Sequence, residues 1–233
     1  MLHREGMTTA GLGLVIGFAL VVATTLWFAT RAVAVASPRA KLPFLIGALV
    51  WLAILGVLAC RGFFLETAAT PAHLVVAVAP PLIAIVVMFV AGRRFVAALP
   101  LQTLTYLHLV RAGVEFVLFG LAMTRLVPSD MTFAGHNFDI VIGFTAPLLG
   151  NLAFLGPTPA RRPLLVWNVI AFAFLVHIVV VAVLSAPLPF QQFNFDRPNI
   201  AILQFPFVWL PGFVVPVVLA SHLVAFRRLL GRL

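Results

Sequence analysis

The chain has 233 residues, of which 63% are hydrophobic and 9% are charged, and its mean hydropathy is +1.17. Soluble domains are roughly 45–50% apolar, so the composition excludes an ordinary soluble domain and predicts an all-α, multi-pass membrane helix bundle surrounded by the lipid bilayer. The net charge of +9 comes without a basic helical stripe, zinc spacing or RNA-binding motif, which argues against nucleic acid as a partner.

Seven apolar stretches follow one another along the chain, and we expect each to be a membrane-spanning helix. They cover residues 9–30, 42–60, 73–91, 101–123, 140–155, 163–184 and 206–226. The first stretch is longer than the apolar region of a signal peptide, so we expect it to stay uncleaved. The fifth is short, which predicts a tilted or partly re-entrant path. Because no linker interrupts the series, residues 1–233 are expected to form a single transmembrane domain.

The charges between these stretches predict the orientation of the chain. Connections one, three and five and the C-terminal tail carry ten basic residues and no acid, namely Arg31, Arg39, Lys41, Arg93, Arg94, Arg161, Arg162, Arg227, Arg228 and Arg232. The remaining connections and the N-terminus hold four basic and five acidic residues. Because cytoplasmic loops carry the excess of Lys and Arg, we expect the N-terminus outside and the C-terminus in the cytoplasm. Adding or losing one span would disrupt this alternation.

One basic residue, Arg111, lies inside a stretch rather than between two. Helical spacing places His108, Arg111 and Glu115 on one face of the fourth span, with Tyr106 beside them. Charges are costly in hydrocarbon, so this face should point into the bundle, where Arg111 and Glu115 can form an ion pair. Such a pair either belongs to a functional site or only fixes helix packing. The other candidate binding residues at membrane depth are Asn168, His177 and His222.

Two outer connections combine phenylalanine with amides and acids. Residues 128–139 read PSDMTFAGHNFD, and residues 186–199 read APLPFQQFNFDRPN. The phenylalanines suit a membrane interface. The polar residues suit a lid or vestibule over a cavity, because binding groups concentrate in loops. The candidate binding residues in these loops are Asn137, Asp139, Gln192, Asn194, Asp196 and Asn199.

The leading functional hypothesis is a polar pocket, open to the outside, that binds or transports a small polar or anionic solute. Arg111 would attract the anion, Glu115 would hold Arg111 or take a proton, and His108 could relay one, because histidine titrates near neutral pH. A second hypothesis is a haem-binding or electron-transfer subunit in which His108 and His222 ligate haem b.

A third hypothesis is a non-catalytic membrane partner or assembly factor, and whether the chain binds a partner protein or a second copy of itself stays open. An enzyme is disfavoured, because no nucleophile and base stand at a recognisable spacing. The known short metal-binding motifs are also missing from the sequence, so no metal site is expected.

Several short motifs occur together in the second half of the chain. They are LQTLTYLH at 101–108 followed by Arg111 and Glu115, MTF at 131–133, NFD at 137–139, WN at 167–168, SAP at 185–187, PNI at 198–200 and HL at 222–223. As a set they resemble a family of uncharacterised bacterial multi-pass integral membrane proteins, from about residue 99 to the C-terminus. The resemblance implies the bacterial cytoplasmic membrane as the location. It implies no activity, because none is established for that family.

Overall fold

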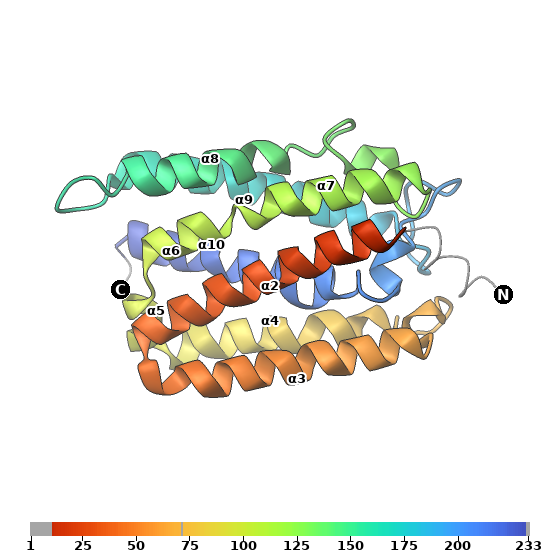
Figure 1. Ribbon diagram of the computed structural model, residues 1–233, viewed down its shortest axis with the longest axis horizontal. Coiled ribbons are helices and arrows are strands. Elements are labelled where there is room, and N and C mark those ends of the chain that lie inside the picture. The colour runs from red at the N-terminus through yellow and green to blue at the C-terminus, as the bar shows by residue number, and fades with distance from the viewer. Residues whose placement is uncertain (1–10, 71, 232–233) are drawn as a thin grey trace.

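The computed structural model describes residues 11–70 and 72–231, and the regular secondary structure in these ranges is helical (Figure 1). Some predictions fall on residues 1–10 and 232–233, which lie outside the described residues. They are the start of the first span, the uncleaved N-terminus, and the charges of Arg4, Glu5 and Arg232.

Each apolar stretch predicted from the sequence forms a helix. The helices are α2 (Gly11–Ala36), α3 (Lys41–Cys60), α4 (Leu74–Ala91), α6 (Leu101–Leu107) followed by α7 (Val110–Met123), α8 (Asp139–Leu152), α9 (Arg161–Leu184) and α10 (Val215–Leu229). A short helix that the sequence pattern did not predict, α5 (Arg93–Ala98), precedes α6. Single 3₁₀ turns lie at Pro38–Ala40, Phe63–Leu65, Ser129–Met131 and Ala201–Leu203.

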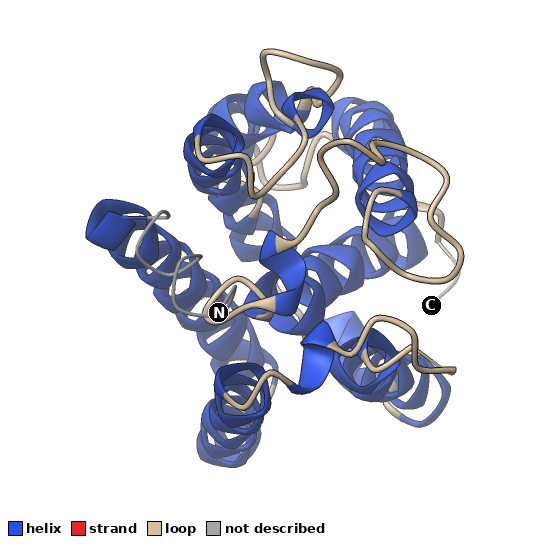
Figure 2. Cartoon of the chain, turned by 90° about the vertical axis from the view of Figure 1, so that its right-hand side faces the viewer, coloured by secondary structure: helices blue, strands red, loops and turns tan. Residues whose placement is uncertain are grey.

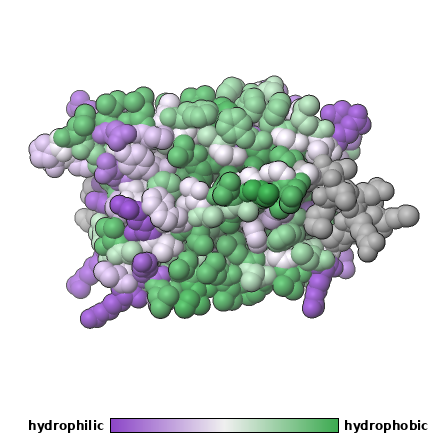
Figure 3. All heavy atoms as spheres, viewed as in Figure 1, coloured by the Kyte–Doolittle hydropathy of each residue, from purple (hydrophilic) through white to green (hydrophobic). Residues whose placement is uncertain are grey.

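Six helical stretches in the described part of the chain are long and apolar enough to cross a membrane. They are Gly11–Ala36, Pro38–Cys60, Leu74–Ala91, Leu101–Met123, Arg161–Leu184 and Leu210–Leu229. The surface between the two ends of the bundle is largely apolar, and the hydrophilic side chains gather toward the ends (Figure 3). The protein is therefore a multi-pass membrane protein built as a helical bundle.

Helix α8 is shorter than the other spans and begins inside the bundle. Its 14 residues rise about 21 Å, against the roughly 30 Å of a hydrocarbon core. In Figure 1 α8 runs alongside α7 but starts well short of the right-hand end, where α7 finishes. Side-chain contacts agree, because Asp139, the first residue of α8, bonds to Arg111. Arg111 lies 12 residues before the end of α7, or about 18 Å along its axis.

The bundle has two distinct ends. The connections after α2, α4 and α8 and the end of α10 lie at the left in Figure 1, and the connections after α3, α7 and α9 lie at the right. Viewed from the right-hand end, loops lie across the tips of the helices (Figure 2). Backbone bonds join these loops, because the N–H groups of Ile200 and Ala201 both donate to the carbonyl of Leu126.

Two of the spans contain a local change of helical geometry. Between α6 and α7 the N–H groups of His108 and Leu109 donate three residues back, to Thr105 and Tyr106, at 3.2 and 3.0 Å. This is a tighter, 3₁₀-like turn in a place without glycine or proline. Before α10 the stretch Leu210–Val214 is a π-helix. Both features interrupt the regular hydrogen-bond ladder and frequently mark functional sites.

Proline accounts for part of the second interruption. Pro216 has no N–H to donate to the carbonyl of Gly212, four residues earlier. The indole Nε1–H of Trp51 on α3 donates to that carbonyl instead, at 2.9 Å. A neighbouring helix therefore satisfies the freed backbone oxygen, which is what a proline-containing membrane helix requires.

Helices α7 and α8 approach closely at Gly143, and this contact generates a prediction. A Cβ at Gly143 would lie 2.4 Å from the backbone nitrogen of Ala112 and 2.6 Å from its Cβ. Backbone cannot move aside cheaply, so we expect Gly143→Ala to lower the free energy of unfolding by about 1–3 kcal/mol. Thermal unfolding of the purified protein in detergent measures this.

The matched control is Gly47→Ala in the middle of α3, where a Cβ meets no atom within 4 Å. Alanine has the higher helix propensity, so this variant should unfold no earlier than the wild type. Equal melting temperatures for the two variants would contradict the close α7–α8 contact.

Candidate functional site

A group of polar side chains lies buried in the middle of the bundle, and we call it the polar cluster. Each member is at most 6% exposed. The members come from the turn between α6 and α7, from α7, from the segment 132–138 with the start of α8, from α9 and from α10, and they are His108, Arg111, Glu115, Asn137, Asp139, Asn168, Ser221 and His222. The predicted inward face of His108, Arg111 and Glu115 is confirmed by their burial.

Arg111 makes an ion pair with Asp139, not with Glu115. Its Nε donates to Oδ2 of Asp139 at 3.0 Å and its Nη2 to Oδ1, so the contact is bidentate. Its Nη1 also donates to the carbonyl of Ala171 on α9 at 2.9 Å. The prediction of an Arg111–Glu115 pair was wrong, because one planar guanidinium matches the two oxygens of a carboxylate best when they approach edge-on. The start of α8 provides that approach.

The segment 132–138 brings Asp139 to this depth. Asn137 is buried, and its Oδ1 accepts the backbone N–H of Asp139 at 3.1 Å. Its Nδ2 donates to the carbonyl of Met131 at 3.1 Å and to Oε1 of Glu115. Asp139 also sits at the first turn of α8, where the partial positive charge of a helix end stabilises an acid. The two loop residues predicted at an outer vestibule therefore lie within the bundle.

His222 is held in one tautomer by its neighbours. Its Nδ1 lies 2.7 Å from Oδ1 of Asn168, an oxygen that can only accept, so Nδ1 carries the proton. The other amide atom, Nδ2 of Asn168, donates to the carbonyl of His222 at 3.3 Å, which fixes the orientation of the amide. The remaining ring nitrogen, Nε2, faces Nη1 of Arg111 at 3.3 Å and accepts from it. His222 thus extends the network of Arg111 to α10.

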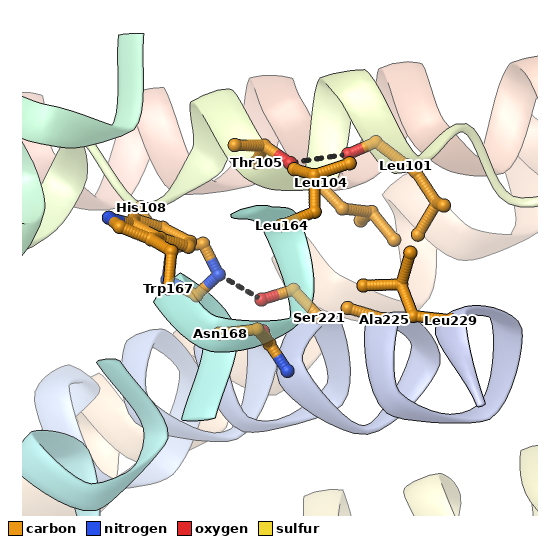
Figure 4. Close-up of a pocket in the computed structure, with 10 residues that line it drawn as sticks. All are labelled: Leu101, Leu104, Thr105, His108, Leu164, Trp167, Asn168, Ser221, Ala225 and Leu229. Carbon is orange, nitrogen blue, oxygen red and sulfur yellow. Dashed lines mark hydrogen bonds between the residues drawn. The ribbon is translucent and has the colours of Figure 1, made fainter. Parts of the chain in front are cut away.

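His108 lies on the other side of His222, toward α6. The Nε2 of His108 pairs with the hydroxyl of Ser221 at 3.0 Å, and the two residues face each other in Figure 4. Its ring packs against His222 with 4.3 Å between centroids and against Trp167 with 5.3 Å. Nδ1 of His108 is buried and has no hydrogen-bond partner among the described residues. A cavity of about 10 Å³ adjoins this group, which is close to the space one water needs.

The arrangement of the two histidines does not suit a haem held between them. Ligation by two histidines places the iron and the porphyrin plane between the rings, whereas these ring centroids are 4.3 Å apart. Both Nε2 atoms also have protein partners, namely Ser221 and Arg111. Haem b ligated by His108 and His222 stays a prediction that these contacts do not favour.

Glu115 is the second residue of the cluster, after His108, with a buried polar atom that lacks a hydrogen-bond partner among the described residues. The side chain is 0% exposed, and Oε1 accepts from Asn137. Oε2 has no hydrogen-bond partner of standard geometry among the described residues, although the backbone of Phe133 lies near the carboxyl group. A cavity of about 60 Å³ lies against Arg111, Glu115, Asn137 and Asp139, and the rest of its wall is apolar side chains, most of them from α7, α9, the π-helical stretch and α10. The cavity has room for several water-sized groups next to the residues of the cluster.

Other predicted site residues are not brought into the cluster. The hydroxyl of Tyr106 donates to Oδ1 of Asn151, on the side facing α8. His177 is exposed on α9, and the buried residues of that helix are Leu164, Asn168, Ala171, Leu175 and Ile178.

Residues of the loop 186–199 also lie apart from the cluster. Gln192 and Asp196 are exposed. Nδ2 of Asn194 donates to the hydroxyl of Ser185 at 2.9 Å. Asn199 is buried, its Nδ2 donates to the carbonyl of Ala182 at 3.1 Å, and its Oδ1 has no partner among the described residues.

The sequence-based selection left out two groups that hold the cluster together. One is Ser221, the partner of His108, which stands directly before His222 and could have been found as a polar residue on the inner face of its helix. The other is the carbonyl of Ala171, which accepts from Arg111 and leaves no trace in the sequence.

The part of the chain that contains the cluster matches a family model. The family is described as a domain of unknown function (DUF8737), and the match covers residues 68–230. The chain belongs to this family. The DUF8737 match starts before residue 99, where the resemblance was expected to start, and it leaves α2 and α3 outside. No curated protein and no solved structure matches the chain.

The choice of ion-pair partner can be tested by a double-mutant cycle. Removing one member of a buried pair leaves the other charge uncompensated, so Arg111→Gln and Asp139→Asn should each lower the free energy of unfolding by about 3–5 kcal/mol. The double variant Arg111→Gln/Asp139→Asn should lose clearly less than the sum of the two. Chemical unfolding in detergent, followed by tryptophan fluorescence, measures all three.

The control is a second double-mutant cycle for the pair Arg111 and Glu115. It uses the variants Arg111→Gln, Glu115→Gln and Arg111→Gln/Glu115→Gln. Its coupling energy should be the smaller of the two, because Glu115 bonds to Asn137 and not to Arg111. A larger coupling between Arg111 and Glu115 than between Arg111 and Asp139 would overturn the assignment.

Proposed function

We propose that this is a seven-span protein of the bacterial cytoplasmic membrane that binds and transports a small polar solute through its polar cluster. The single observation that carries the proposal is the fully buried Glu115, whose Oε2 has no hydrogen-bond partner among the described residues and whose side chain forms part of the wall of a cavity of about 60 Å³. An ionisable side chain with an unused valence inside a membrane bundle is costly, and such residues mark substrate and ion pathways.

The count of seven rests on treating the segment 132–138 together with α8 as one crossing. Irregular backbone occurs at membrane depth only where protein buries it or where it lines a cavity. Thr132, Asn137 and Asp139 are buried, and two of them line the cavity, whereas Phe133, Ala134, His136 and Phe138 are exposed. Secondary transporters bind solutes near the midplane at discontinuous helices of this kind. The broken crossing therefore supports both the span count and the position of the site.

The orientation follows from the distribution of charge. The left-hand end of Figure 1 carries the basic connections, which contain no acid. An excess of Lys and Arg marks the cytoplasmic side, so the right-hand end faces outward. Residues 124–138 and 185–209 then cover the outer entrance. The bacterial origin rests on the resemblance noted from the sequence motifs.

The contacts of Arg111 favour a solute that is not an anion. Its guanidinium already donates to Asp139, Ala171 and His222, so an anion would have to displace the aspartate. The free valence belongs to the carboxyl group of Glu115, which accepts hydrogen bonds when it is ionised and can also take up a proton. The matching solute is small and brings a donor or a positive charge, such as an alkali or ammonium ion or a proton carried by water. In this proposal Arg111 does not bind the solute; it holds α8, α9 and α10 in place around the site.

A solute can pass the site only if the helices around it move. The two interruptions of the helical hydrogen-bond ladder are places where such movement can occur. The tight turn at His108 and Leu109 lies directly before Arg111, and the π-helical residues Leu210 and Val214 line the cavity. Another cavity of about 10 Å³ lies toward the outer end beside Asn199, and it shares wall residues Val114, Leu118 and Leu210 with the larger one.

Charge movement in reconstituted liposomes tests the proposal. Solid-supported membrane electrophysiology applies concentration jumps of Na⁺, K⁺, ammonium or H⁺ to the wild type and to Glu115→Gln. We expect one of these probes to evoke a saturable current in the wild type. We expect Glu115→Gln to weaken its half-saturation at least about tenfold, since a hydrogen bond to a charged group is worth roughly 1.5–3 kcal/mol.

The matched control is Glu66→Gln, which removes an acid that is 75% exposed in an outer loop. It should keep the wild-type response. A well-folded Glu115→Gln protein with unchanged currents, or a wild type that responds to phosphate and acetate but to none of the four cations, would contradict the proposal.

A further inference from the structure

A large hollow on the membrane-facing surface lies away from the polar cluster. It is a groove of about 640 Å³ between α3 and α4, with α10 and the π-helical stretch as its floor. Its wall is apolar, and the residues that define its shape are Phe44, Gly47, Trp51, Pro81, Met88 and Phe213. A volume of this size is typical of sites for small organic ligands, which lie between about 300 and 1,000 Å³.

The groove occupies one half of the membrane. Its wall on α3 runs from Pro43 to Trp51, within the first half of that helix. Its wall on α4 runs from Pro80, near the middle of that helix, to Met88, three residues before its end. The start of α3 and the end of α4 lie at the same end of the bundle (Figure 1). The groove therefore extends from that end to about the middle of the bilayer, the depth of one lipid leaflet.

Basic side chains stand on both sides of the mouth of the groove. Ala40 and Phe95 line the mouth, and Lys41 and Arg94 are their direct neighbours in the chain. Arg39 and Arg93 lie one residue further out, and all four basic side chains are exposed. The two connections that carry them, residues 37–41 and 92–100, contain no acid. An apolar slot one leaflet deep is thus paired with a cationic rim at the headgroup layer.

We propose that this groove is a binding site for an anionic phospholipid of the leaflet at the basic end. An acyl chain lies in the groove between α3 and α4, and the phosphate is held by Lys41, Arg93 and Arg94. Basic pockets between membrane helices recognise anionic headgroups in this way, and each Lys or Arg near the surface contributes about 1 kcal/mol. The polar cluster and its solute take no part in the argument.

Native mass spectrometry of the detergent-purified protein, titrated with phosphatidylglycerol or phosphatidylcholine, tests the headgroup contact. The wild type should retain phosphatidylglycerol in preference. The variant Lys41→Gln/Arg93→Gln/Arg94→Gln should bind it about fivefold more weakly for each charge removed. The matched control Arg61→Gln/Arg125→Gln/Arg197→Gln removes three charges from the opposite end of the bundle and should keep the wild-type affinity.

A second variant tests the groove independently of charge. Gly47 lines the slot, and a Cβ there meets no atom within 4 Å, so the side chain of Gly47→Leu can start into the slot without a clash at its Cβ. It should weaken binding of both lipids at least severalfold. Gly13 is equally open but lines a different groove between α2, α7 and α8, so Gly13→Leu is its control.

Three results would overturn the proposal. One is equal retention of the two lipids by the wild type. Another is unchanged binding in Gly47→Leu, which would leave only a surface attraction for the headgroup. The last is a wild-type protein that carries no lipid and occurs as a dimer disrupted by Gly47→Leu, because a protein helix would then occupy the groove.

Discussion

A guanidinium in the middle of an apolar bundle must find partners for its donors within the protein, and the arrangement of the second half of the chain follows from this requirement. Arg111 on α7 takes its partners from α8, α9 and α10. Each bond fixes a helix at a given depth and rotation, because a buried charge left without a partner costs several kcal/mol. The ion pair with Asp139 has the largest structural consequence, since it requires a carboxylate at mid-depth.

The chain meets this requirement by starting α8 within the bundle and running the irregular segment 132–138 inward. Asn137 makes the arrangement possible, because it bonds to the backbone on both sides of itself and to Glu115. Asp139 is thereby paired with Arg111. Glu115 lines the cavity and keeps one carboxyl oxygen without a hydrogen-bond partner among the described residues. In the cluster, Arg111 and its partners hold the helices in place, whereas Glu115 is the group able to bind a solute. The proposed function depends on this division of roles.

The sequence was sufficient to predict the apolar helices and the burial of one face of the fourth span. Those features arise from composition and from local periodicity, which a single chain displays. The partner of Arg111 could not be predicted in the same way, because Glu115 is its neighbour by helical spacing whereas Asp139 reaches it only through the fold. The 3₁₀-like turn at His108 was equally hidden, since neither glycine nor proline stands there.

The exposure of His177, in contrast, could have been predicted from the sequence. The buried positions of α9 recur every three or four residues up to Ile178, so the neighbouring position falls outside that face and its exposure was predictable.

The short α8 also affects the lipid around the protein. Its 14 residues cover about 21 Å, while the 24 residues of the adjacent α9 cover about 36 Å. The exposed side chains of Phe133, His136 and Phe138 precede α8, so the part of this flank before α8 presents aromatic and polar groups instead of a regular helix. In the seven-span arrangement, acyl chains on this flank meet a hydrophobic height smaller than on the flank formed by α9. Thinning of the bilayer or tilting of helices relieves such a mismatch. We therefore expect the bilayer to be thinner next to α8 than next to α9.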